Sequence, residues 1–252
     1  MNIINFLIHF NKRIIVGGLV MINKFNLKGK VTASFILVLG LFLCFKLIQV
    51  SATNNIDREM KNEVSQKFQA WIEYYKSNDT ILKSSSPYSY IENDKFEEIK
   101  NLSPEYLTYI LREIENEPSA VFALWGLKGI SKVKDLPKWD SDDQCVSIWN
   151  SYIENLPLKF NEIKKELYTT VDAEKIKLKT QEIVDLGYPA LPLIMEEDNI
   201  KMEAVKEILF KQNSNENDEE KANKEIAHYK EVLKKNTKIK ELESFKINRE
   251  YK

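Results

Sequence analysis

The feature that most constrains the fold of this chain is an internal repeat. Residues 98–113, EIKNLSPEYLTYILRE, return in altered form as residues 182–197, EIVDLGYPALPLIMEE, 84 positions later and without a gap. The identical pairs are Glu98 and Glu182, Ile99 and Ile183, Leu102 and Leu186, Leu107 and Leu191, Ile110 and Ile194, and Glu113 and Glu197. A repeat of this kind is typical of chains that stack similar supersecondary units, so it predicts an architecture before any other feature does.

Each copy predicts two short helices joined by a turn, with a third helix behind them. In the first copy Ser103 is a suitable N-cap and Pro104 a suitable first helical residue. In the second copy Gly187 ends one helix and Pro189 opens the next. The third helices are expected at residues 119–130 and 201–211. Because none of these helices can bury its apolar face alone, the units are expected to stack.

The second copy resembles HEAT-like (armadillo-type) helical repeats, in which Leu-Gly is followed by Ala-Leu-Pro-x-Leu; here the residues are LGYPALPL at 186–193. The first copy departs from the pattern, because Ser103 stands in place of the glycine and Thr108 in place of the second proline. The resemblance covers about forty residues of each copy, the usual length of such units. It implies an α-solenoid that binds partners on its surface, usually without catalysis, and it implies no active-site residue.

An apolar run near the N-terminus predicts export. The run VTASFILVLGLFLCF at residues 31–45 follows three lysines and precedes Val50-Ser51-Ala52, the three parts of a secretory signal peptide, so cleavage is expected after Ala52. The alternative is a retained signal anchor at residues 31–50, although a spanning helix needs about 20 apolar residues. In either case residues 53–252 are expected outside the cell, secreted or held at the cell membrane.

Residues 1–20 carry a second apolar patch ahead of the basic stretch, which no part of a signal peptide explains. We therefore expect translation to start at Met21 and residues 1–20 to be an upstream extension assigned in error. A true N-terminal extension is the alternative.

Charge is distributed unevenly along the chain. Residues 1–52 carry six basic side chains and no acidic one, so the rest carries 31 basic against 38 acidic side chains, a net charge of −7. An acidic body lacks the basic surface that binds the phosphates of DNA or RNA. Nucleic acid is therefore excluded as a partner.

A helix at residues 57–77 is predicted by one apolar stripe with spacings of three and four. The stripe consists of Met60, Val64, Phe68, Trp71 and Tyr75. With Tyr74, its aromatic residues could form a platform for a sugar or peptide, but a stripe that faces the core is the favoured interpretation. Residues 78–93 contain SSSP and are predicted to be a loop.

The acidic cluster WDSDD at residues 139–143 permits two interpretations. Three carboxylates within four residues could contribute oxygens to Ca²⁺, but the spacing and glycine of an EF-hand are missing. The favoured interpretation is a capping box of Ser141 and Gln144, with Asp142 and Asp143 at the positive N-terminus of the helix that follows. That helix is expected at 142–155, Pro157 is expected to end it, and a further helix is expected at 160–167.

Beyond the repeats, residues 212–220 are entirely polar and predict a loop, and residues 219–252 predict a terminal helix that caps the stack or binds a partner. The predicted segments are therefore 1–20 (upstream extension), 21–52 (signal peptide or anchor), 53–93 (helix and loop), 94–211 (HEAT-like repeats) and 212–252 (polar loop and C-terminal helix).

Few residues after Ala52 suit catalysis or metal binding. The only His is His228 and the only Cys is Cys145, so no zinc site rich in His or Cys can be assembled. A Cys–His catalytic pair would need these two residues, and a small buried Cys145 is the favoured interpretation. The sequence therefore predicts no catalytic, cofactor-binding or metal-binding residue, and no cofactor. A hydrolase that uses carboxylates alone stays open, because acidic residues are plentiful.

These observations predict an all-α chain, a short α-solenoid of HEAT-like helical repeats preceded by one N-terminal apolar segment. The expected function is that of a non-catalytic exported binding module, whose stacked helices present a concave surface to a protein or peptide. The membrane is a further partner through residues 31–50 if the signal is retained. Two alternatives are a carboxylate-based hydrolase of the cell envelope and a membrane-anchored immunity or regulatory protein. The sequence assigns neither a particular partner nor an oligomeric state.

Overall fold

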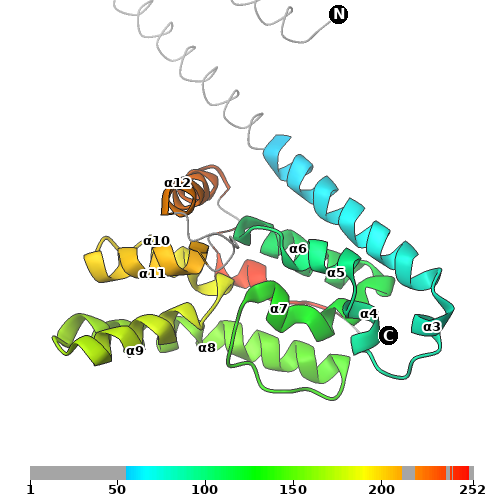
Figure 1. The fold of residues 1–252 in the computed structure, drawn as a ribbon, viewed down its shortest axis with the longest axis horizontal. Helices are drawn as coiled ribbons and strands as arrows, with labels where there is room; N and C mark the ends of the chain where they lie inside the picture. The colour runs from blue at the N-terminus through cyan, green and yellow to red at the C-terminus, as the bar shows by residue number, and fades with distance from the viewer. Residues whose placement is uncertain (1–54, 212–218, 237–238, 240, 250–252) are drawn as a thin grey trace, which may run out of the picture. The chain divides into compact units, whose positions relative to one another are not determined.

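The computed structural model describes residues 55–211, 219–236, 239 and 241–249 (Figure 1). The chain divides into two units, Met1–Ile56 and Asp57–Lys252, and the second contains nearly all of the described residues. Helices are the only regular elements in these ranges, which confirms the all-α prediction. None of the helices described is long and apolar enough to span a membrane. The predicted upstream extension, signal segment and cleavage after Ala52 lie outside the described residues.

The first described helix, residues 55–76, is a core helix (cyan in Figure 1). Its predicted apolar stripe is buried, from Met60 at 6% exposure to Trp71 at 0%. The indole N–H of Trp71 donates to the Tyr90 carbonyl at 2.7 Å, and the Tyr75 hydroxyl donates to the Ser119 carbonyl at 2.7 Å. Tyr74, 40% exposed, is the stripe's exposed neighbour. The stripe therefore serves packing, and the aromatic platform considered from the sequence is not formed by it.

Residues 78–93 were expected to be a loop, and this prediction is wrong in part. They form two one-turn helices, α3 (Asp79–Leu82) and α4 (Tyr88–Ile91). The Asn78 side chain caps α3, because it accepts the N–H groups of Thr80 and Ile81. In α4 the Tyr90 ring stacks on Phe122 at 3.8 Å between ring centroids, so burial of an aromatic side chain holds this turn in place.

The sequence repeat is also a repeat of backbone conformation. The first copy consists of α5 (Asp94–Lys100), the 3₁₀ turn η1 (Pro104–Tyr106) and α6 (Leu107–Asn116). The second consists of α9 (Ala173–Val184), η3 (Tyr188–Ala190) and α10 (Leu191–Met195). The end of α9 lies 84 residues after the end of α5. The same separation of 84 residues holds for the two 3₁₀ turns and for the starts of α6 and α10. Even the closing hydrogen bonds correspond, from Leu102 to Ile99 and from Leu186 to Ile183.

The third helix of each copy is confirmed, with one difference. In the second copy it is α11 (Ile200–Lys211). In the first copy the chain forms η2 (Pro118–Gly126), which is a 3₁₀ helix, and then α7 (Leu127–Ser131). Four helices of the C-terminal half then contact each other in the order α8 (Asp142–Thr169), α9, α11 and α12 (Glu219–Lys235) (Figure 1).

The second of the two glutamates that both copies share, Glu113 in the first and Glu197 in the second, binds the long helix that precedes its copy. Glu113 accepts a hydrogen bond from Ser65 of the first described helix at 3.2 Å. Glu197 accepts hydrogen bonds from Lys164 at 2.7 Å and Tyr168 at 3.0 Å, both on α8. The Lys164 hydrogen bond, with that of Tyr168, holds the pKa of Glu197 below its usual value. An identical residue therefore contacts the preceding long helix in each copy, through different partner side chains.

The two copies meet where the turn of the second packs on the end of the first. Gly187 has φ +69°, and a Cβ placed there would lie 2.5 Å from the Ser131 carbonyl oxygen. The Lys134 N–H donates to the Asp185 carbonyl at 3.0 Å next to this contact. The equivalent Ser103 makes its turn with φ −66°, which any residue can adopt. Glycine is thus required at position 187 in the second copy, and the equivalent position 103 in the first copy does not need it.

The prediction that Pro157 ends a helix is wrong, since α8 (Asp142–Thr169) is a single helix of 28 residues. Its buried residues continue in phase through the proline: Cys145, Trp149, Ile153, Leu156, Phe160, Ile163 and Leu167. A proline inside a helix costs about 3 kcal/mol. Burial of one large apolar side chain contributes about 1.5–3 kcal/mol, so the four that follow Ile153 outweigh the proline.

The predicted terminal helix is also corrected. Among the described residues from 219 on, the α-helix is α12 (Glu219–Lys235), a 3₁₀ turn follows as η5 (Leu242–Phe245), and residues 246–249 are not helical. Asn236 ends the helical part, and its buried side chain donates to the Tyr109 hydroxyl at 2.8 Å. Tyr109 in turn donates to Asp57 at 2.7 Å. Most of the predicted polar loop, residues 212–218, lies outside the described residues.

Substitution of Gly187 tests the junction between the copies. We expect Gly187→Ala to lower the free energy of unfolding by about 2–3 kcal/mol, because it forces a left-handed residue and a clash with backbone atoms. The matched control is Gly129→Ala on α7, where a Cβ would first meet the flexible Lys100 side chain at 3.3 Å. Urea unfolding of both variants measures the difference, and equal stabilities would show that the junction does not need this glycine.

Candidate functional site

The acidic cluster at residues 139–143 begins α8 and caps it. Ser141 accepts the Gln144 N–H at 3.2 Å, and the Gln144 side chain accepts the Asp140 N–H at 2.7 Å. This is the predicted capping box, with its return bond one residue earlier than expected. Asp142 lies in the first turn and accepts the indole N–H of Trp125 at 3.0 Å. Within the described ranges, no group of three or more His, Cys, Asp or Glu side chains could hold a metal ion.

Cys145 and His228, the residues considered for a nucleophilic pair, have different neighbours. The Cys145 thiol is buried and donates to the Leu124 carbonyl at 3.6 Å. Burial, with a smaller contribution from Asp142, raises its pKa to about 12, so it is a neutral thiol at physiological pH. The His228 side chain is 65% exposed and lies 3.4 Å from Glu105. The structure does not bring the two residues together.

Two open hollows on the surface are shallow. One lies between α10 and α12, beside Met195 and Leu233, and has a volume of about 250 Å³. The other lies between the first described helix and α6, beside Ser65 and Glu113, and has a volume of about 350 Å³. Both hollows are open to solvent along one side. Neither hollow offers an enclosed reaction chamber.

A more specific site is formed where the chain binds part of itself. Residues 245–249, here called the C-terminal segment, begin with the last residue of η5 and continue outside any helix, with Lys246 in the extended region at φ −75° and ψ 150°. Phe245 and Ile247 are each 1% exposed, whereas Asn248 between Ile247 and Arg249 is exposed. This alternation is that of an extended strand which lays one side on a surface.

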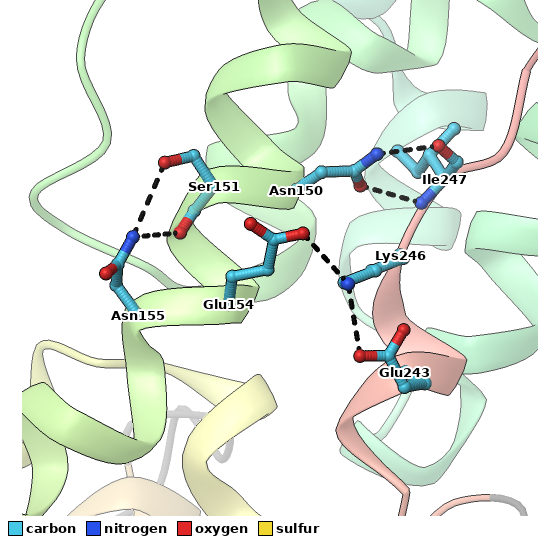
Figure 2. A network of polar contacts seen from close by, with 7 residues as sticks. All are labelled: Asn150, Ser151, Glu154, Asn155, Glu243, Lys246 and Ile247. Atoms are coloured by element: carbon cyan, nitrogen blue, oxygen red, sulfur yellow. Dashed lines mark hydrogen bonds and ion pairs between the residues drawn. The ribbon is translucent and has the colours of Figure 1, made fainter.

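The side chains of α8 bind the main chain of the C-terminal segment (Figure 2). The Asn150 amide group donates to the Ile247 carbonyl at 2.9 Å and accepts the Ile247 N–H at 2.9 Å. The neighbouring Trp149 donates its indole N–H to the Phe245 carbonyl at 2.6 Å. Three main-chain groups of the segment are thus bound by two adjacent residues of one helix.

Charged groups flank these main-chain bonds. Glu154, one turn further along α8, accepts from Lys246 at 2.9 Å, and Glu243 also pairs with this lysine at 3.0 Å (Figure 2). These hydrogen bonds, first that to Glu154, raise the pKa of Lys246. Because exposed ion pairs contribute little to stability, the main effect of Glu154 and Glu243 is to favour a cationic side chain at position 246.

The other side of the segment lies on the C-terminal end of α6. Glu115 accepts the Asn248 N–H at 3.0 Å. The Arg249 guanidinium donates to the carbonyls of Ile114 at 2.9 Å and Pro118 at 3.3 Å. Carbonyls at the end of a helix have no partner within it and favour a cation. We call the set Trp149, Asn150, Glu154, Ile114 and Glu115 the α8 docking site.

Sequence reasoning missed the α8 docking site because it predicted a helix through residues 219–252. The alternation of Phe245, Lys246 and Ile247 was the signal for an extended segment. Asn150 gave no signal, since a single Asn beside a buried Trp on a helix has no characteristic pattern. Its role depends on a segment almost one hundred residues away.

Comparison with models of known protein families, with curated proteins and with solved structures found no match. The function of the α8 docking site is therefore inferred from its own contacts.

Two asparagines of α8 provide a matched test of these contacts. Asn150→Ala removes two hydrogen bonds and leaves the buried main chain of Ile247 without them, so we expect a loss of about 1–3 kcal/mol in the free energy of unfolding. Asn155 is exposed and bonds only within the helix, to the Ser151 carbonyl at 2.8 Å and to its hydroxyl (Figure 2). Asn155→Ala is therefore expected to change stability by no more than about 0.5 kcal/mol.

Hydrogen exchange measured by NMR locates the effect. The Ile247 amide should lose protection in Asn150→Ala and keep it in Asn155→Ala. Unchanged protection at Ile247 in both variants would contradict the assigned role of Asn150.

Proposed function

We propose that the protein is a non-catalytic exported helical-repeat module that binds extended polypeptide at the α8 docking site. One observation carries the proposal: the Asn150 side chain pairs with both the N–H and the C=O of a single residue, Ile247. An amide group has both a donor and an acceptor, so it matches any residue of an extended chain whatever its side chain. Side-chain contacts on either side then add selectivity, as in other modes of peptide recognition.

The proposed architecture is a short HEAT-like α-solenoid. Three observations support it: the repeated backbone conformation, the contacts of Glu113 and Glu197 with the long helix before each copy, and the packing of Gly187 on Ser131. In this arrangement α8 precedes the second copy as residues 55–76 precede the first. The proposed location, exported and either secreted or membrane-anchored, is supported by the apolar run at residues 31–50 and the lysines before it.

A second candidate function is favoured by one feature, a line of aromatic side chains. Tyr88, 48% exposed, lies with its ring 5.6 Å from Trp125, and Trp125 lies 6.5 Å from Trp139. The Trp139 indole N–H is buried without a hydrogen-bond partner among the described residues. With Asp142 beside them, these rings could serve a carboxylate-based hydrolase of cell-envelope polymer. The binding module is preferred, because Asp142 is already engaged by Trp125 and by its position in the first turn of α8.

Panning of a phage-displayed library of linear peptides on the full chain tests the binding module. We expect enriched peptides that bind the wild-type and Asn155→Ala proteins equally and lose at least about tenfold in affinity on Asn150→Ala, since about 1.4 kcal/mol corresponds to tenfold. Enrichment that does not depend on Asn150, or no enrichment at all, would contradict the proposed site.

Zymography with cell-wall polymer tests the hydrolase. The binding-module proposal expects no cleared zone for the wild-type protein. A cleared zone that disappears when Asp140, Asp142 and Asp143 are together replaced by Asn, in a protein that unfolds cooperatively, would favour the hydrolase instead.

A further inference from the structure

We propose that the C-terminal segment is an internal ligand of the α8 docking site, which an external segment of the same chemistry displaces. This inference rests on the proposed function and adds to it the class of ligand and a means of control. The external ligand is an extended polypeptide that carries an aromatic residue, a lysine and an aliphatic residue in succession, with an arginine two positions later.

The ligand class follows from what each part of the site contacts. The positions of Phe245 and Ile247 are buried and require apolar side chains. The position between them faces Glu154, a carboxylate 2.9 Å from the Lys246 amine, so it selects a cation. The Arg249 position lies at the carbonyl of Ile114 in the last turn of α6 and at the carbonyl of Pro118 at the start of η2, which also select a cation.

The charge of the chain favours the same ligands. Residues 53–252 carry a net charge of −7, which attracts a cationic peptide at long range. Glu115 and Glu154 then provide two carboxylates at the site itself, one to an N–H group and one to an amine. An acidic peptide of the same length would be repelled by these two carboxylates.

The contacts of the segment are separate from those of the helix before it. α12 packs on α11 and η1, whereas the segment binds α8 and α6. The Asn236 side chain, bonded to Tyr109, fixes the chain at the end of α12. Residues 245–249 can therefore leave the α8 docking site while α12 keeps its own contacts.

We expect an external segment to replace the C-terminal segment, because departure of the C-terminal segment alone would leave the α8 docking site empty. An empty site would leave the Trp149 indole N–H without its acceptor and would expose the surfaces under Phe245 and Ile247. A second extended segment restores both. The internal ligand competes at an effective concentration on the order of millimolar, as is usual for segments on short linkers, so it excludes weak external ligands and yields to strong ones.

Fluorescence anisotropy with a labelled peptide tests the exchange on the full chain. The peptide is ELESFKINR, the sequence of residues 241–249, with a scrambled peptide of the same composition as control. In one variant, Phe245→Ser with Ile247→Ser disables the internal ligand. We expect this variant to bind the peptide at least about tenfold more tightly than wild type, because internal competition is removed. Addition of Asn150→Ala should abolish the gain, and addition of Asn155→Ala should preserve it.

A second variant covers the case in which the double substitution prevents folding. Lys246→Glu keeps both apolar side chains and places a carboxylate opposite Glu154, so it weakens only the internal ligand. We expect the Lys246→Glu protein to bind the peptide ELESFKINR several-fold more tightly than the wild-type protein does. Reversal of the partner, Glu154→Lys, should shift preference toward a peptide with Glu at the lysine position.

The outcomes separate the two proposals. Equal, Asn150-dependent binding to wild type and to both variants would overturn internal competition and leave polypeptide binding at the α8 docking site intact. No binding to any protein that retains cooperative unfolding would overturn both. Binding of the scrambled peptide with equal affinity would overturn the ligand class.

Discussion

The apolar stripe of α8 is the interaction on which the rest of the structure depends. It stays in phase from Cys145 to Leu167, and burial along it keeps the helix continuous through Pro157. Opposite ends of the same helix then contact two neighbours. Lys164 and Tyr168 bind Glu197 of the second repeat copy, while Trp149 and Asn150 bind the C-terminal segment. If Pro157 ended the helix, these two sets of contacts would not share one rigid element.

The two copies of the repeat have similar local conformations and different neighbours. The two copies use the same helix ends and the same 3₁₀ turn, but they meet other surroundings. At Gly187 the neighbouring backbone of Ser131 comes so close that only glycine fits, whereas Ser103 has no such constraint. The copies are therefore alike in local conformation and differ where each must pack against the rest of the chain.

The α8 docking site combines contacts that any residue can make with contacts that favour particular side chains. The Asn150 amide pairs with main-chain groups that every residue has, and the flanking carboxylates of Glu115 and Glu154 favour cations. Buried apolar positions supply most of the binding energy, because exposed charge pairs add little. Such a site suits a binding module whose ligand is an extended segment, and the chain's own segment shows how the ligand lies.

The sequence by itself determined the helical class, the repeat and its register, the buried stripe of the first described helix and the cap at Ser141, because each depends on neighbours within a few residues. Only the tertiary structure decided that α8 continues through Pro157, that Tyr88–Ile91 is helical and that residues 246–249 lie outside any helix and pack on α8 and α6. Those outcomes depend on burial against residues far along the chain. The α8 docking site belongs to this second group, since Asn150 and Ile247 are 97 residues apart and no local pattern links them.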